Sequence, residues 1–145
     1  MAVRVWWAEK PKENYEQAAV KELADKLAKL SEQFYIFVNF CVGISKPAEQ
    51  IDVSVFTSRS AYIIELKSSA SYPVYGAING RWTRADNTPF GERNPVRQVA
   101  DQYFALREWL FENRGTFLAS NKAAVTNKLE SWNDIRKFIV LYPTK

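Results

Sequence analysis

The sequence predicts an α/β domain. Two segments with the composition and apolar spacing of amphipathic helices are separated by several runs of aromatic and β-branched residues, and one further such run ends the chain. This order of elements allows a mixed β-sheet flanked by helices. At 145 residues, of which 47% are hydrophobic, the chain has the size of one domain and can bury a substantial core.

The first expected element is a helix over residues 13–33. These residues are good helix formers, and their apolar positions recur at the spacing of one helical face. That face holds Val20, Leu23, Leu27 and Leu30. A buried strand is expected at residues 34–42, which are rich in aromatic and β-branched side chains, and a loop containing Pro47 is expected at residues 43–49.

The middle of the chain has the pattern of β-hairpins. Residues 51–57 and 61–68 are two β-prone runs separated by only three residues, and this spacing predicts an antiparallel hairpin. Residues 72–84 contain the Asn-Gly turn signal and predict a further strand or hairpin, followed by a polar loop that runs to residue 93.

A second long helix is expected after this loop. Asn94 and Pro95 predict its start, because Asn caps free backbone amides and Pro is tolerated at the first helical position. The helix should run to about residue 113, with Gly115 as a stop signal. A less regular helix is expected over residues 118–132, and a last strand over residues 136–142.

The composition limits the chemistry that the chain can perform. Cys41 is the only cysteine, and there is no histidine. The chain therefore cannot form an internal disulfide, which suits the reducing cytoplasm, and it cannot build zinc sites from Cys and His or use a histidine base. The net charge of +4 is spread along the chain and permits nucleic acid as a partner, while no stretch is suited to span a membrane.

The predicted central hairpin brings chemically useful side chains together. Because side chains alternate between the two faces of a strand, Glu65 and Lys67 project to the same face. A turn between the two runs places Asp52 against Glu65 or Lys67. Two carboxylates suit Mg²⁺ or Mn²⁺, and a neighbouring lysine can orient water or balance charge on a phosphate. The alternative is that Asp52 caps a strand while Glu65 and Lys67 form a solvated pair on an exposed face. The apolar runs around Asp52 and Glu65 favour burial, where charge needs a partner.

Both long helices carry further polar side chains of interest. Glu16 falls within the apolar stripe of the first helix, where a carboxylate needs a partner, although the helix dipole also favours an acid there. The free amides after Asn94 can bind an anion such as a phosphate. Arg93 and Arg97 lie beside them, with Gln98 in the first turns. Helix capping and exposed arginines are the alternative explanation for this group.

Four short motifs follow one another along the chain. They are E-Q-A-A-V-K-E-L at residues 16–23, I-D-V-S-V-F at 51–56, I-I-E-L-K-S at 63–68 and N-P-V-R-Q at 94–98. Their order and spacing resemble the nuclease-related domain (NERD) family of the PD-(D/E)XK nuclease superfamily, over nearly the whole chain. The resemblance implies a restriction-endonuclease-like fold, with a mixed central β-sheet flanked by α-helices.

The resemblance also implies roles for the residues of the central hairpin. Asp52 and Glu65 would bind the metal with help from the main-chain carbonyl of Leu66. Lys67 would assist the attacking water.

Outside the hairpin, the resemblance implies that Glu16 is an accessory acid. Gln98 matches the polar residue that related nucleases place by the active site on the following helix, and Trp82 matches a structural tryptophan. The related Q-x-x-x-Y signature is not met, because Tyr103 lies one position too far from Gln98.

The function expected from these features is Mg²⁺- or Mn²⁺-dependent hydrolysis of DNA phosphodiesters. The alternative is a nucleic-acid-binding or docking module that keeps the nuclease fold but does not cut. Residues 1–145 are expected to form a single domain, which is compatible with the N-terminal part of a longer protein. Because family members often carry a further domain, a fused or associated helicase or other DNA-processing domain is an expected partner, as is a second copy of the chain.

Overall fold

A mixed five-stranded sheet forms the centre of the molecule. The computed structural model describes residues 2–43, 48–58, 60–69, 73–113 and 135–143. The strands lie in the order β1-β2-β3-β4-β7, where β1 is Val3–Trp7, β2 is Phe34–Val42, β3 is Glu49–Phe56, β4 is Ala61–Ser68 and β7 is Ile135–Tyr142. The inner pairs β2–β3 and β3–β4 are antiparallel, whereas β1 and β7 pair in parallel at the two edges. The expected α/β fold with a mixed sheet is confirmed.

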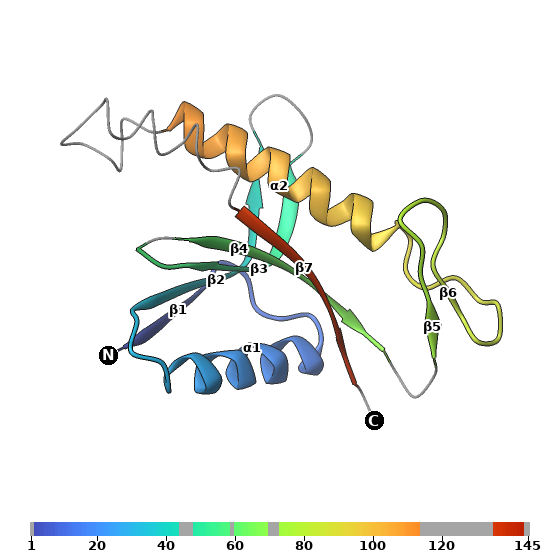
Figure 1. The fold of residues 1–145 in the computed structure, drawn as a ribbon, viewed down its shortest axis with the longest axis horizontal. Coiled ribbons are helices and arrows are strands. Elements are labelled where there is room, and N and C mark those ends of the chain that lie inside the picture. Colours follow the sequence, from blue (N-terminus) through green and yellow to red (C-terminus); the bar gives the residue numbers. More distant parts are fainter. Residues whose placement is uncertain (1, 44–47, 59, 70–72, 114–134, 144–145) are drawn as a thin grey trace.

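Two helices cover opposite faces of this sheet (Figure 1). Helix α1 (Asn14–Leu27) packs on one face through a cluster that includes Val20, Val53 and Leu66. Helix α2 (Pro95–Glu112) packs on the other face through a second cluster, in which Leu106 contributes from the helix and Ile63 from β4. We call these the α1 face and the α2 face.

The first helix is shorter than the sequence predicts. It ends at Leu27, and the main chain of residues 28–30 continues in hydrogen-bonded turns, with the Leu30 amide bonded to the Leu27 carbonyl. Leu30, expected on the buried face, is 54% exposed. The chain must turn back here to enter β2 at Phe34, so the apolar spacing beyond Leu27 is not used for packing.

Strand β1 was not predicted from the sequence. Its five residues form an edge strand that pairs with β2 in parallel, from Val3 opposite Phe34 to Trp7 opposite Val38. Such a short strand is stabilised by a partner far along the chain, and local sequence patterns do not report that partner. The predicted strand or hairpin of residues 72–84 is present as β5 (Val74–Tyr75) and β6 (Thr83–Arg84).

The expected Gly115 stop and the helix at residues 118–132 lie outside the described residues. Within the described part of the chain, no helix is both long and apolar enough to cross a membrane.

Near the middle of β2 and β3, the alternation of side chains between the two faces of the sheet shifts in both strands. Val38 and Val53 are register partners and belong to the α1-face cluster, whereas the paired residues Phe40 and Ile51 pack in the α2-face cluster. Between them Asn39 has a positive φ of 52°, a conformation that Asn tolerates better than most residues. The same register places Asp52 opposite Asn39, so Asp52 lies where the hairpin bends.

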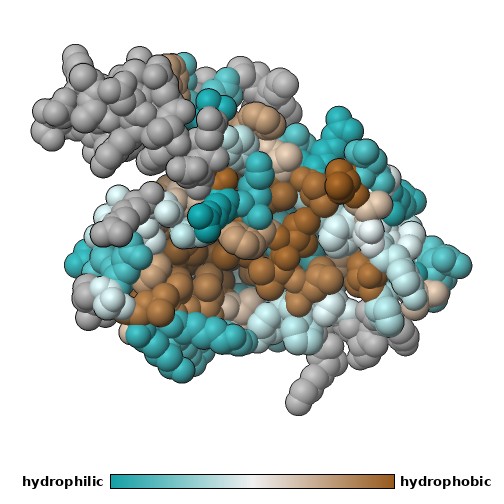
Figure 2. Space-filling view, viewed as in Figure 1, coloured by the Kyte–Doolittle hydropathy of each residue, from teal (hydrophilic) through white to brown (hydrophobic). Residues whose placement is uncertain are grey.

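An apolar hollow lies between α1 and the sheet. It has a volume of about 170 Å³ and is lined mainly by Val20, Leu23, Ile64 and Val140, with Glu22 at its rim. Figure 2 shows apolar side chains gathered across the middle of this view of the molecule. The hollow is thus apolar in its interior, with the charged side chains of Glu22 and Lys26 also in its lining.

Candidate active site

Asp52 and Glu65 come together where β3 and β4 separate. The last paired residues of the two strands are Val53 and Ile64, and the same register, continued by one residue, places Asp52 opposite Glu65. Asp52 Oδ2 accepts a hydrogen bond of 2.9 Å from the Leu66 amide. Here the Asp52 side chain, instead of the β3 main chain, is bonded to β4. We call this point of strand separation the fork, and both carboxylates lie at it.

Glu65 is a buried carboxylate with two hydrogen-bonding partners. Its side chain is 1% exposed, and its Oε1 lies 2.6 Å from Lys67 Nζ. Its Oε2 accepts from Gln102 Nε2 at 2.6 Å. Removing a carboxylate from water is costly unless it is paired and hydrogen-bonded, and here both conditions are met.

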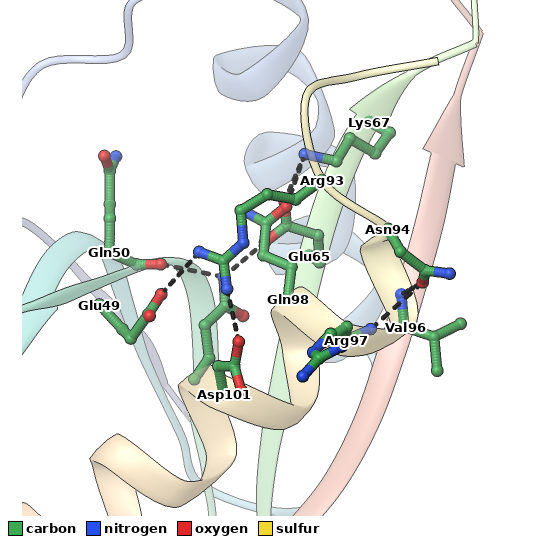
Figure 3. Close-up of polar contacts among 11 residues, drawn as sticks. Glu49, Gln50, Glu65, Lys67, Arg93, Asn94, Val96, Arg97, Gln98 and Asp101 are labelled. Carbon is green, nitrogen blue, oxygen red and sulfur yellow. Dashed lines mark hydrogen bonds and ion pairs between the residues drawn. The ribbon is translucent and has the colours of Figure 1, made fainter. Parts of the chain in front are cut away.

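Lys67 links the carboxylate to the second helix. Its side chain is 22% exposed, and its Nζ donates to Gln98 Oε1 at 3.2 Å in addition to pairing with Glu65. Figure 3 shows Lys67 and Glu65 on β4 facing Gln98 on α2. The ammonium group is therefore held beside the carboxylates but still reaches solvent, where a substrate phosphate could approach it.

Gln102 was not singled out from the sequence. It is fully buried, and its Nε2 donates to the Gln50 carbonyl at 2.9 Å as well as to Glu65. Gln102 follows Gln98 by four residues, so both lie on one face of α2. That spacing could have revealed Gln102, which occupies the position at which the Q-x-x-x-Y signature has a tyrosine. Tyr103 is instead buried in the α2-face cluster.

The pKa of Asp52 reflects the accumulation of negative charge. Burial, followed by the negative charge of Glu65, raises the pKa of Asp52 from its ordinary value of 3.8 to about 7. The Leu66 amide and the Lys67 ammonium act in the opposite direction. A cation would stabilise the ionised form of Asp52 in this environment, because burial and the charge of Glu65 both oppose it.

Glu16 lies near this pair without joining it directly. It is in the first turn of α1, and its Oε2 accepts from the Lys12 amide at 3.2 Å and from Asn39 Nδ2 at 3.4 Å. Its negative charge contributes to the raised pKa of Asp52. Burial and then the charge of Glu16 also raise the pKa of Tyr15 to about 12. Glu16 thus adds to the electrostatics of the site from the α1 side.

The start of α2 is organised by Asn94. Its Oδ1 accepts from the amides of Val96 and Arg97, as expected for a helix cap. Its Nδ2 donates to the carbonyls of Ala77, Ile78 and Gly80 and so fixes the preceding loop to the helix. These two amides are occupied by the cap and are not free for an anion.

The two predicted anion-binding arginines differ in their surroundings. Arg93 forms ion pairs with Glu49 at 3.2 Å and Asp101 at 2.6 Å (Figure 3). Arg97 is exposed and lines a cavity of about 560 Å³ together with Arg81 and residues of the loop before α2. Arg97 therefore presents positive charge at this end of α2. It does so together with Arg81, a residue that was not expected from the sequence.

The donor atoms at the fork suit a hard divalent cation. Among the described residues no group of three or more His, Cys, Asp or Glu side chains is arranged to hold a metal. An ion at the fork would therefore have two carboxylate ligands, from Asp52 and Glu65. The N–H and C=O groups of one strand residue point the same way, so the Leu66 carbonyl points toward Asp52 like its amide. Mg²⁺ typically uses one or two carboxylates and completes its shell with water and substrate phosphate, so these donors fit it.

Comparison with known proteins identifies one family. A family model of the nuclease-related domain, NERD, matches residues 12–141. The match includes every residue of the site described above. No curated protein and no solved structure matches the chain.

Proposed function

The chain belongs to the nuclease-related domain family, and we propose that it is a Mg²⁺- or Mn²⁺-dependent nuclease that hydrolyses DNA phosphodiester bonds. One observation carries the proposal. The buried carboxylate of Glu65 is held next to Asp52 and within 2.6 Å of the Lys67 ammonium, at the end of the β3–β4 pairing. This arrangement supports a cation site with a phosphate-stabilising charge beside it.

Each side chain at the fork has a role in this proposal. Asp52, Glu65 and the Leu66 carbonyl would hold the ion, which when bound polarises the phosphate and makes a water more acidic. Lys67 donates to the attacking water or to a phosphate oxygen and offsets the charge that develops in the transition state.

The residues of α2 position this group. Gln98 directs the Lys67 ammonium, and Gln102 fixes the Glu65 carboxylate through the 2.6 Å bond to its Oε2. Glu16 would act as an accessory acid that strengthens the negative potential at Asp52.

DNA is the proposed substrate because basic side chains lie at the start of α2, close in sequence to Gln98. Arg97 and Arg81 would contact backbone phosphates, with Asn94 holding the loop that carries Arg81. Arg93 would join them after exchanging one of its carboxylate partners for a phosphate. A cytoplasmic location, a fused or associated DNA-processing domain such as a helicase, and self-association are parts of the same proposal.

Metal binding and plasmid cleavage, measured on the same variants, test the proposal. We expect calorimetry to show that Mn²⁺ binds to one site and that the protein nicks supercoiled plasmid only with Mg²⁺ or Mn²⁺. The Asp52→Ala, Glu65→Ala double variant should lose both properties. The matched control is Glu22→Ala, Asp25→Ala, which removes two exposed acids of α1 that pair with lysines and should change neither property.

Two results would decide against this function. Unchanged Mn²⁺ affinity in the Asp52→Ala, Glu65→Ala variant would show that the ion does not bind at the fork. DNA binding without cleavage at saturating Mn²⁺ would identify the chain as a binding module that keeps the nuclease fold.

A further inference from the structure

Three aromatic rings form a stack at the β1 end of the sheet. The Trp6 ring lies 5.0 Å from that of Phe37, with an interplanar angle of 12°, and 6.0 Å from that of Tyr35, with an angle of 15°. All three side chains remain exposed, at 42% for Trp6 and 36% for each of the others. We call Trp6, Tyr35 and Phe37 the aromatic platform.

The platform lies on the same face of the sheet as Glu65. Phe37 makes edge-on contacts with Phe40 and Phe56, and both of these pack against the α2-face cluster. Val5, the neighbour of Trp6 in β1, packs in the α1-face cluster, so alternation directs Trp6 to the α2 face.

The strand register relates the position of the platform to that of the candidate active site. Trp6 is opposite Phe37, Phe37 is opposite Ser54, and Ser54 is opposite Ile63. Two residues further along, β3 carries Asp52 and β4 carries Glu65, a shift of about 7 Å along the strands. On the same face as Glu65, the rings therefore lie about 7 Å along the strands from it, and two to three strand spacings of about 4.8 Å across the sheet.

We propose that the aromatic platform binds unpaired bases of single-stranded DNA and leads such a strand to the fork between β3 and β4. A base is a flat aromatic ring that can continue the stack formed by Tyr35, Trp6 and Phe37. Paired bases in a duplex are already stacked and cannot do so. Delivery of the strand to the fork rests on the proposed nuclease function, whereas binding of bases by the platform does not.

Charge on the same face supports nucleic acid as the occupant. Arg4 is exposed and is opposite Tyr35 in the register. It lies two residues before Trp6 in β1, so its side chain projects to the same face of the sheet. A cation beside a ring stack matches the alternation of phosphate and base along a single strand. An apolar protein surface would match the rings but would leave Arg4 without a complementary charge.

The test measures binding in EDTA, so that no cleavage occurs and the result does not depend on nuclease activity. The probe is a 15-nucleotide single strand with a central 2-aminopurine, whose fluorescence falls when the base stacks on a ring, and the same sequence as a duplex. Trp6→Ala should weaken single-strand binding about 10- to 100-fold and abolish the quenching, with little change for the duplex. Trp6→Phe should largely restore both.

Trp7→Ala is the matched control. Trp7 adjoins Trp6 in the same strand, is 37% exposed, and projects to the opposite face. We expect it to leave single-strand binding and quenching unchanged.

Several outcomes would overturn the platform. These are parental single-strand affinity in Trp6→Ala, equal losses for single strand and duplex, or a parent protein that does not quench the probe. A change of oligomeric state in Trp6→Ala with unaltered quenching would assign the rings to contact between copies instead. Quenching that depends on Trp6, in a protein that proves unable to cut DNA, would support the platform and reject only the nuclease function.

Discussion

The two faces of the central sheet are each covered by one helix but bury different kinds of residue. The α1-face cluster includes Val20 and Ile36, and the buried polar side chain of Asn39 donates to Glu16 of α1. On the other side, α2 packs Gln102 against Glu65. Glu65 and Gln102 are at most 1% exposed.

The α2 face thus combines an apolar cluster that stabilises the fold with buried polar groups that cost stability and build a site. Gln102 Oε1 has no hydrogen-bonding partner among the described residues, nor does the buried Ser54 Oγ. An unsatisfied buried polar group costs about 1–3 kcal/mol. An apolar residue such as leucine at position 102 would have no unsatisfied side-chain group. Proteins typically accept such a cost at functional sites.

The largest expected effect is on the α2 face, where Lys67→Ala should lower the rate of DNA cleavage about 10²- to 10³-fold. Lys67 cannot ligate a cation, so Mn²⁺ affinity should change little. Single-turnover cleavage at saturating Mn²⁺ measures the rate, with Lys21→Ala on the exposed surface of α1 as the control. A parental rate in Lys67→Ala would show that Lys67 is only a structural partner of Glu65.

A smaller effect is expected for Gln102→Leu, which tests whether the buried amide positions Glu65. Losing the bond to Glu65 Oε2 should lower Mn²⁺ affinity and the cleavage rate about 10- to 100-fold, as for other partners of metal ligands. The melting temperature should also fall, because Glu65 Oε2 and the Gln50 carbonyl lose their donor, a loss that removal of the unsatisfied Oε1 offsets only in part.

Val20→Ala on the α1 face sharpens this contrast. Val20 is 3% exposed and belongs to the apolar α1-face cluster, so truncating it should lower the melting temperature. Mn²⁺ affinity of the folded protein should stay parental. If Gln102→Leu behaved like Val20→Ala, the proposed division between the two faces would be wrong.

The smallest expected effect is a pH dependence of stability that originates from Asp52. Its pKa is about 7 in the folded protein and 3.8 ordinarily, so between these values the folded state holds a proton that the unfolded chain has lost. The stability of the metal-free protein should therefore fall as pH rises from about 4 to about 7.

Urea denaturation in EDTA at pH 5, 6, 7 and 8 measures this trend. Asp52→Asn should flatten it relative to the parent, and saturating Mn²⁺ should oppose it at pH 8, because the ion stabilises the ionised pair. A parent and variant with identical pH profiles would show that Asp52 is ionised throughout this range.

The sequence by itself determined the local features of the fold and of the candidate site. Alternation along a strand put Glu65 and Lys67 on one face, and the short link to the preceding run predicted the hairpin that brings Asp52 beside them. The Asn94 cap was equally predictable. Each of these depends on rules that act over a few residues, so a single pattern in the chain contains the necessary information.

Only the tertiary structure decided which distant residues meet. Strand β1 exists because β2 offers it a free edge, Gln102 reaches Glu65 because α2 crosses this part of β4, and Arg93 finds Glu49 on β3. These contacts join segments far apart in sequence, and their geometry follows from how whole elements pack, which no local pattern of residues encodes.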